Sequence, residues 1–287
     1  FLIELSGYDE IRLRFAADAD ERFYGFGEQF THLNMRGRRF RLCTSEQGIG
    51  RGAQPLSALV DLVSPGSAGD AFTTYAPMPV FLTSAGRALS FDQPTIYHFD
   101  VCRKNRRAVS LDAACAPLSG WLFHADTPLG LIERHTAVTG RLKPLPEFAY
   151  GTILGLRGGR AAAERVITAC ERHGARISAL WIEDWQGRRG RNGGPPLWWR
   201  WVPDETLYPD FRDWARALNG RGIALLGYAN PFLSVSDENP LYLEGREMGC
   251  FVKRADGSDY ELDFFTGKEY RFVMVDLTDP KAYGWLK

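Results

Sequence analysis

Glu183 and Asp184 are two adjacent carboxylates that end an apolar, β-prone run and are followed at once by Trp185. Carboxylates accept hydrogen bonds from hydroxyl groups, and an aromatic ring covers the apolar C–H face of a polyol. Charged residues at the C-terminal end of a buried parallel strand are typical of the active rim of a (β/α) barrel. The pattern therefore predicts that at least one of the two carboxylates contacts a sugar. Because side chains alternate along a strand, we expect that carboxylate to be Glu183.

A structural role for the same carboxylates is the alternative interpretation. Arg157, Arg188 and Arg189 could pair with Glu183 or Asp184 and merely hold the rim together. The sugar contact is favoured because charged residues that end an apolar barrel strand tend to be functional.

Two further apolar runs share the design of the run before Glu183. They are FAYGTILGLRGG from Phe148 and GIALLGYANPF from Gly222, each separated from the next by a helix-like segment. Right-handed crossovers make such strands parallel and bring their C-terminal ends to one rim. The residues expected there are Leu156, Arg157, Gly158, Gly159, Glu183, Asp184, Trp185, Gln186, Tyr228, Asn230, Pro231 and Phe232.

The helix-like segments show amphipathic periodicity. The first places one apolar stripe before Gly174, formed by Ala162, Val166, Ala169 and Cys170. The second places another before Asn219 and Gly220, formed by Phe211, Trp214, Ala215 and Leu218. A stripe of this kind covers one face of a sheet, and a glycine is a frequent residue just after a helix. The second half of the chain therefore predicts the first part of a (β/α)8 TIM barrel.

The first half has the pattern of an antiparallel β-sandwich. Short alternating runs recur between turn-rich breaks: EIRLRFA, RRFRLCT, MPVFLTS, ALSFD, TIYHFDV and RAVSLDA. The segment from Ser119 to Pro146 is expected to be a short helical passage into a linker, where Pro144 and Pro146 mark the boundary. We expect a β-sandwich domain over residues 1–143 and a barrel domain over residues 144–287.

Composition narrows the class of protein. The 35 basic and 35 acidic residues give a net charge of zero, which argues against a nucleic-acid partner. No apolar run reaches the roughly 18 residues of a membrane span, and no signal peptide is evident, so a cytoplasmic protein without a membrane partner is expected. The 5 cysteines and 5 histidines are scattered, which predicts no metal and no cofactor. The oligomeric state stays open.

Ordered motifs along nearly the whole chain resemble glycoside hydrolase family 31, and among its members the sulfoquinovosidases. They are FYGFGEQF at Phe23, RGRRFRLCTSEQGIGR at Arg36, ALWIEDWQG at Ala179, GYANPF at Gly227 and VDLTDPKAYGW at Val275. The resemblance implies a galactose-mutarotase-like sandwich before a (β/α)8 barrel, and retaining hydrolysis of α-glycosides by two aspartates. The substrate-binding residues expected from motifs and resemblance are Glu183, Asp184, Trp185, Trp199, Arg157, Asn230, Glu28 and Gln29.

The resemblance also implies that this chain is a piece of a longer protein, truncated at both ends. In the family the nucleophile lies on the fourth barrel strand and the acid/base follows it, whereas the chain ends at Lys287 in a helix that Asp279 and Pro280 should begin. No catalytic residue is therefore expected within it. A non-catalytic carbohydrate-binding or regulatory fragment is the alternative to part of an α-glycosidase.

The expected sulfonate pocket departs from the sulfoquinovosidase pattern. Those enzymes resemble one another in a glutamine where this chain has Glu183, and in an arginine where it has Pro196, three residues before the matching Trp199. An anionic Glu183 would repel a sulfonate by about 1 kcal/mol or more at contact. Arg157, where relatives have a glutamine, could neutralise Glu183 or itself accept an anion. We expect a preference for a neutral or differently charged α-glycoside.

Overall fold

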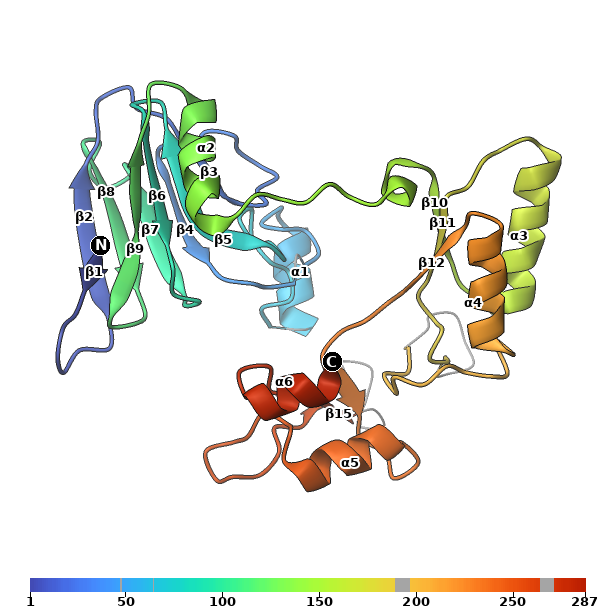
Figure 1. Cartoon of the computed structure of the whole chain (residues 1–287). Coiled ribbons are helices and arrows are strands. Elements are labelled where there is room, and N and C mark those ends of the chain that lie inside the picture. The colour runs from blue at the N-terminus through green and yellow to red at the C-terminus, as the bar shows by residue number, and fades with distance from the viewer. Residues whose placement is uncertain (47, 64, 189–196, 264–270) are drawn as a thin grey trace. The chain divides into compact units, whose positions relative to one another are not determined.

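The computed structural model describes residues 1–287 except 47, 64, 189–196 and 264–270. The chain divides into two compact units, Phe1–Leu142 and Lys143–Lys287. Strands predominate in the first unit, and helices follow strands along the second (Figure 1).

The first unit consists of two antiparallel sheets. In spatial order, the five-stranded sheet contains β1 (Leu2–Ile3), β9 (Leu118–His124), β6 (Arg87–Phe91), β5 (Pro77–Thr83) and β3 (Phe23–Gly27). The four-stranded sheet contains β2 (Ile11–Ala16), β8 (Ala108–Ala113), β7 (Tyr97–Val101) and β4 (Arg38–Leu42). Both sheets contribute to one buried cluster, which confirms the predicted sandwich.

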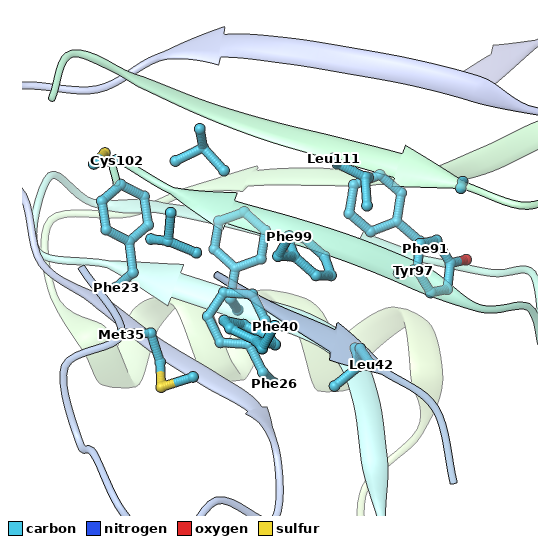
Figure 2. Close-up of a cluster of buried hydrophobic side chains, with 14 of the residues drawn as sticks. Phe23, Phe26, Met35, Phe40, Leu42, Phe91, Tyr97, Phe99, Cys102 and Leu111 are labelled. Carbon is cyan, nitrogen blue, oxygen red and sulfur yellow. The ribbon is translucent and has the colours of Figure 1, made fainter. Parts of the chain in front are cut away.

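Aromatic side chains fill the space between the two sheets (Figure 2). The Phe26 ring lies 5.0 Å from the rings of Phe40, Phe81 and Phe99. Phe26 reaches this position from a bulge between Gly25 and Gly27, where the pairing of β3 with β5 shifts register. A side chain at Gly27 would lie 2.2 Å from the Ala76 carbonyl oxygen, so the motif FYGFG needs glycine there.

Two helices accompany the sandwich, α1 (Leu56–Val63) and α2 (Pro128–Thr139). Thr127 caps α2 by accepting a hydrogen bond from the Gly130 amide, and Leu131 packs against Phe123 and Ala88 of the five-stranded sheet. The prediction of a helical passage from Ser119 was therefore wrong for its first part, because β9 occupies 118–124. Paired on both sides by β1 and β6, this segment gains ladder hydrogen bonds that its local sequence does not reveal.

The second unit begins with the short 3-10 turn η1 (Glu147–Tyr150) and a three-stranded parallel sheet. Its strands are β10 (Ile153–Leu156), β11 (Ala179–Ile182) and β12 (Ala224–Gly227). The crossovers are α3 (Arg160–Arg172) and α4 (Phe211–Gly220). This β-α-β-α-β order confirms the start of a TIM-barrel domain, and the described strands do not close a barrel.

One face of the parallel sheet packs against both helices. Leu180 and Ile182 lie in a buried cluster with Ile167 of α3 and with Trp214 and Leu218 of α4. The predicted stripe of α4 is confirmed in Trp214 and Leu218. The predicted stripe of α3 was wrong by one position, because Ala163 and Ile167 are the buried residues and Ala162, Val166, Ala169 and Cys170 line a shallow outer groove. Alanines on several faces of α3 left its core side ambiguous.

The rest of the second unit forms a small antiparallel sheet with two helices. Its elements are β13 (Phe232–Ser234), β15 (Arg271–Met274), β14 (Leu262–Asp263), α5 (Pro240–Met248) and α6 (Pro280–Leu286). Phe232 therefore belongs to this sheet and not to the end of the third parallel strand, a correction to the expected rim. Asp279 caps α6 as predicted, accepting a hydrogen bond of 2.9 Å from the Lys281 amide. Within the described residues, no helix is long and apolar enough to cross a membrane.

Candidate functional site

Arg157 and Glu183 lie side by side immediately after neighbouring strands. The pairing of Leu156 with Ile182 places the next residue of each strand at the same level of the sheet. The Arg157 guanidinium binds one carboxylate oxygen, Oε2 of Glu183, through both Nε and Nη2. The side chains keep 42% and 25% of their surface exposed. The sheet thus brings together two of the predicted site residues.

The Arg157–Glu183 pair is only half satisfied. Among the described residues nothing donates to Glu183 Oε1, and Arg157 makes no hydrogen bond besides those to Glu183. A carboxylate oxygen can accept two hydrogen bonds, and a guanidinium has five N–H donors. The pair therefore presents an acceptor and donors next to each other on an exposed rim.

Asp184 lies in a different environment, although it follows Glu183 directly. Its side chain is 0% exposed. Oδ2 accepts a hydrogen bond of 2.8 Å from the Gly158 amide, and Oδ1 accepts one of 2.5 Å from the Tyr208 hydroxyl. Arg188 Nε lies 3.6 Å from Oδ2 and balances the buried charge. In this structure the Asp184 carboxylate has no surface to offer a ligand.

Tyr208 is a site residue that sequence reasoning missed. It lies 24 residues from Asp184 in the chain, in the segment before α4, and no motif or periodicity connects the two. Burial raises the pKa of Tyr208 above its ordinary value, and the hydrogen bond to Asp184 and the charge of Asp184 raise it further. Tyr208 therefore stays a neutral donor to Asp184 at physiological pH.

Trp185 and Asn230 converge on Tyr228. The Trp185 indole donates to the Tyr228 carbonyl oxygen at 2.8 Å and stacks on Phe211. Asn230 Nδ2 lies 3.2 Å from the Tyr228 hydroxyl, and Asn230 Oδ1 accepts from the Phe232 amide. These contacts connect the end of β11 to the segment after β12, so both predicted residues shape the rim.

Trp199 packs in an aromatic cluster of the small sheet. Its ring lies 5.1 Å from that of Phe232 and 4.8 Å from that of Phe272, and its main chain binds Ser234. These contacts fix Trp199 against the small sheet. No described contact joins Trp199 to Arg157 or Glu183.

The remaining predicted residues lie in other parts of the chain. Glu28 and Gln29 belong to the first unit, where the Glu28 amide binds the Ala76 carbonyl and Gln29 Nε2 binds the Phe26 carbonyl. Pro196 and Arg189 lie outside the described residues. The described residues contain no cluster of three or more histidine, cysteine, aspartate or glutamate side chains that could hold a metal ion.

Comparisons with known proteins place these observations in a family. Residues 5–56 match the glycosyl hydrolase 31 N-terminal galactose mutarotase-like domain, and residues 143–287, half of the chain, match the glycosyl hydrolases family 31 TIM-barrel domain. The chain is 32% identical to a sulfoquinovosidase of Escherichia coli over 98% of its length and 34% identical to one of Agrobacterium fabrum over 99%. It covers 40% and 42% of those relatives.

Solved structures show the same fold. A family 31 sulfoquinovosidase from E. rectale, in complex with the aza-sugar inhibitor IFGSQ, superposes with a TM-score of 0.87 at 35% identity, over 97% of this chain and 41% of that one. A Flavobacterium johnsoniae dextranase complexed with glucose superposes with a TM-score of 0.80 at 18% identity, over 99% of this chain and 32% of that one, which supports the fold alone. With both family models matched in order and the barrel model covering half of the chain, the protein belongs to glycoside hydrolase family 31.

Proposed function

We propose that this chain supplies part of the sugar-binding rim of a retaining α-glycosidase. The half-satisfied Arg157–Glu183 pair at the C-terminal ends of β10 and β11 carries the proposal. The family relationship supplies the reaction class, in which one aspartate attacks the anomeric carbon and another protonates the leaving oxygen.

The pair suits a vicinal diol. Glu183 Oε1 accepts a hydrogen bond from one hydroxyl, while a free N–H of Arg157 donates to the neighbouring hydroxyl oxygen. Hydrogen bonds to charged groups contribute about 1.5–3 kcal/mol each. The ion pair also holds both side chains in place before the sugar arrives, which lowers the entropic cost of binding.

An α-glycoside with an uncharged sugar is the substrate class that the geometry supports best. Because Arg157 already neutralises Glu183, a sulfonate that approaches the pair meets no net positive charge. A sulfonated glycoside is the second candidate. The greater exposure of Arg157 and the sulfoquinovosidase names of two relatives favour it.

The test is hydrolysis by the longest native polypeptide that contains these 287 residues. We expect turnover of an aryl α-glucoside with the α-anomer as the first product in proton NMR, and a higher kcat/KM than on the matched aryl α-sulfoquinovoside. A tenfold preference for the sulfonate would overturn the neutral assignment, and its loss in Arg157→Gln would locate the anion site at Arg157. Sugar binding without turnover of either substrate would instead support the non-catalytic alternative.

A further inference from the structure

We infer that Asp184 is a positioning residue that fixes the turn carrying Arg157 and does not itself contact the sugar. The inference concerns the same rim and rests on the proposed function of the Arg157–Glu183 pair. It agrees with the expectation that Glu183 faces the sugar, and it differs from the sequence prediction that listed Asp184 among the substrate-binding residues. The observation behind it is a closed ring of contacts that starts and ends at the Asp184 carboxylate.

The first side of the ring is the turn after β10. Gly158 and Gly159 have φ angles of +101° and +88°, a left-handed conformation that other residues rarely adopt. Glycine restricts the backbone less than other residues do, so contacts with neighbouring groups must select the conformation of this turn. The Gly158 amide donates to Asp184 Oδ2 at 2.8 Å, so the carboxylate binds the peptide unit directly after Arg157.

The second side of the ring is the segment before α4. The Leu207 carbonyl oxygen accepts a hydrogen bond of 2.8 Å from the Arg160 amide, and a side chain at Gly159 would lie 2.6 Å from the same oxygen. The next residue, Tyr208, returns to Asp184 Oδ1 through its hydroxyl. The turn is therefore held from two directions, and Asp184 joins both.

Burial and charge separate Asp184 from ligand binding. The carboxylate is 0% exposed, and each of its oxygens accepts a hydrogen bond from the protein. Displacing these partners to bind a sugar would leave a buried amide or hydroxyl unpaired, which is costly. Asp184 therefore holds the turn after β10 in place and does not contact the sugar.

The consequence for the site concerns Arg157. Its Cα lies between β10, which the sheet fixes, and Gly158, which Asp184 fixes. Without the Asp184 bond the turn can rotate, and the guanidinium loses its alignment with Glu183. The two adjacent carboxylates therefore have different roles. Glu183 faces the ligand, and Asp184 fixes the turn that positions Arg157, the ion-pair partner of Glu183.

The test uses NMR on the 287-residue chain without any sugar. Two signals are measured. Hydrogen exchange of the Gly158 amide reports whether the turn is held, and hydrogen exchange of the Arg157 side-chain Nε–H reports whether the ion pair with Glu183 is intact. In Asp184→Asn and in the milder Tyr208→Phe, we expect about tenfold faster exchange of both protons, since each loses a bond of the ring. Asp213→Asn, at an exposed carboxylate paired with Arg216, should change neither signal.

Glu183→Gln is the matched variant on the other side of the pair. This variant should speed hydrogen exchange of the Arg157 Nε–H, while exchange of the Gly158 amide stays within about twofold of the wild type. If Asp184→Asn or Tyr208→Phe speeds Gly158 exchange and leaves the Arg157 Nε–H unchanged, Asp184 only stabilises the fold and the inference is wrong. Unchanged Gly158 exchange in both variants also contradicts it. Because no sugar is present, these results are independent of whether the proposed function holds.

Discussion

Two arginine–glutamate pairs, one in each unit of the chain, show how the same residue types serve different purposes. In the sandwich, Arg87 binds both oxygens of Glu21, through Nε at 3.2 Å and Nη2 at 2.5 Å. The Glu21 side chain is 0% exposed and also accepts a hydrogen bond from the Asp18 amide. In the barrel unit, Arg157 binds only Oε2 of Glu183. The two arginines are similarly exposed, at 36% and 42%, but Glu183 keeps 25% of its side-chain surface exposed.

The difference lies in what each pair leaves unused. A buried carboxylate needs a hydrogen-bond partner for each oxygen, since an unpaired buried oxygen destabilises the fold. An exposed pair can leave an oxygen and several N–H groups to water, and a ligand can replace that water. The Glu21–Arg87 pair therefore holds the sandwich together, while the Arg157–Glu183 pair retains the capacity to bind.

The largest expected effect is on catalytic turnover. Measuring turnover tests whether either arginine–glutamate pair catalyses glycoside hydrolysis. Both glutamates are held by guanidinium groups, and neither family aspartate is expected in the chain. We expect no turnover of aryl α-glycosides by the purified 287-residue chain, because loss of a nucleophile or acid removes orders of magnitude in rate. Hydrolysis that disappears on mutating Glu183 or Glu21 would show that one pair is catalytic.

The next effect is on stability and separates the two pairs directly. Glu21→Ala should lower the free energy of unfolding by about 2 kcal/mol, because it leaves the Asp18 amide and the partly exposed Arg87 guanidinium without their carboxylate partner. Glu183→Ala should cost less than about 1 kcal/mol, as exposed pairs usually do. Scanning calorimetry of both variants measures the difference. Equal costs would mean that the Arg157–Glu183 pair is structural as well.

The smallest effect concerns an intermediate case, in which Arg221 joins Glu164 of α3 and Glu171 at 3.0 and 2.9 Å. Burial by itself would raise the pKa of Glu164, but hydrogen bonds from Trp214 and Arg221 outweigh it and lower that pKa. A lowered folded-state pKa gives stability that is present above the ordinary glutamate value and is lost as pH falls through the folded value. We expect this loss in acid to be under about 1 kcal/mol because the pair is partly exposed.

Thermal unfolding across the acid range tests the Glu164 prediction. The wild type should lose stability there, and Glu164→Gln should be less stable at neutral pH and flatter in acid. A parallel pH dependence in the variant and the wild type would assign the acid loss to other carboxylates, among them Asp112, whose pKa is also lowered by Arg12.

The sequence was informative where local patterns decide the structure. Apolar runs and right-handed crossovers were enough to expect Arg157 beside Glu183, and their ion pair was one of the alternatives considered. The link from Asp184 to Tyr208 was not predictable, because it depends on the path of the segment before α4 and on side-chain rotamers. The prediction of a helix from Ser119 onward was wrong for its first part because that too depends on distant contacts. The segment forms β9 by pairing with β1 and β6.

The most direct test of the account compares two matched substitutions, Glu183→Gln and Glu21→Gln, in the longest native polypeptide that contains the chain. The measurement is kcat/KM on an aryl α-glucoside, normalised to the folded fraction. We predict a loss of roughly 10- to 100-fold for Glu183→Gln, which corresponds to one hydrogen bond to a charged group, and a change within about twofold for Glu21→Gln. Equal losses, or a larger loss for Glu21→Gln, would contradict the assignment of sugar binding to the Arg157–Glu183 pair.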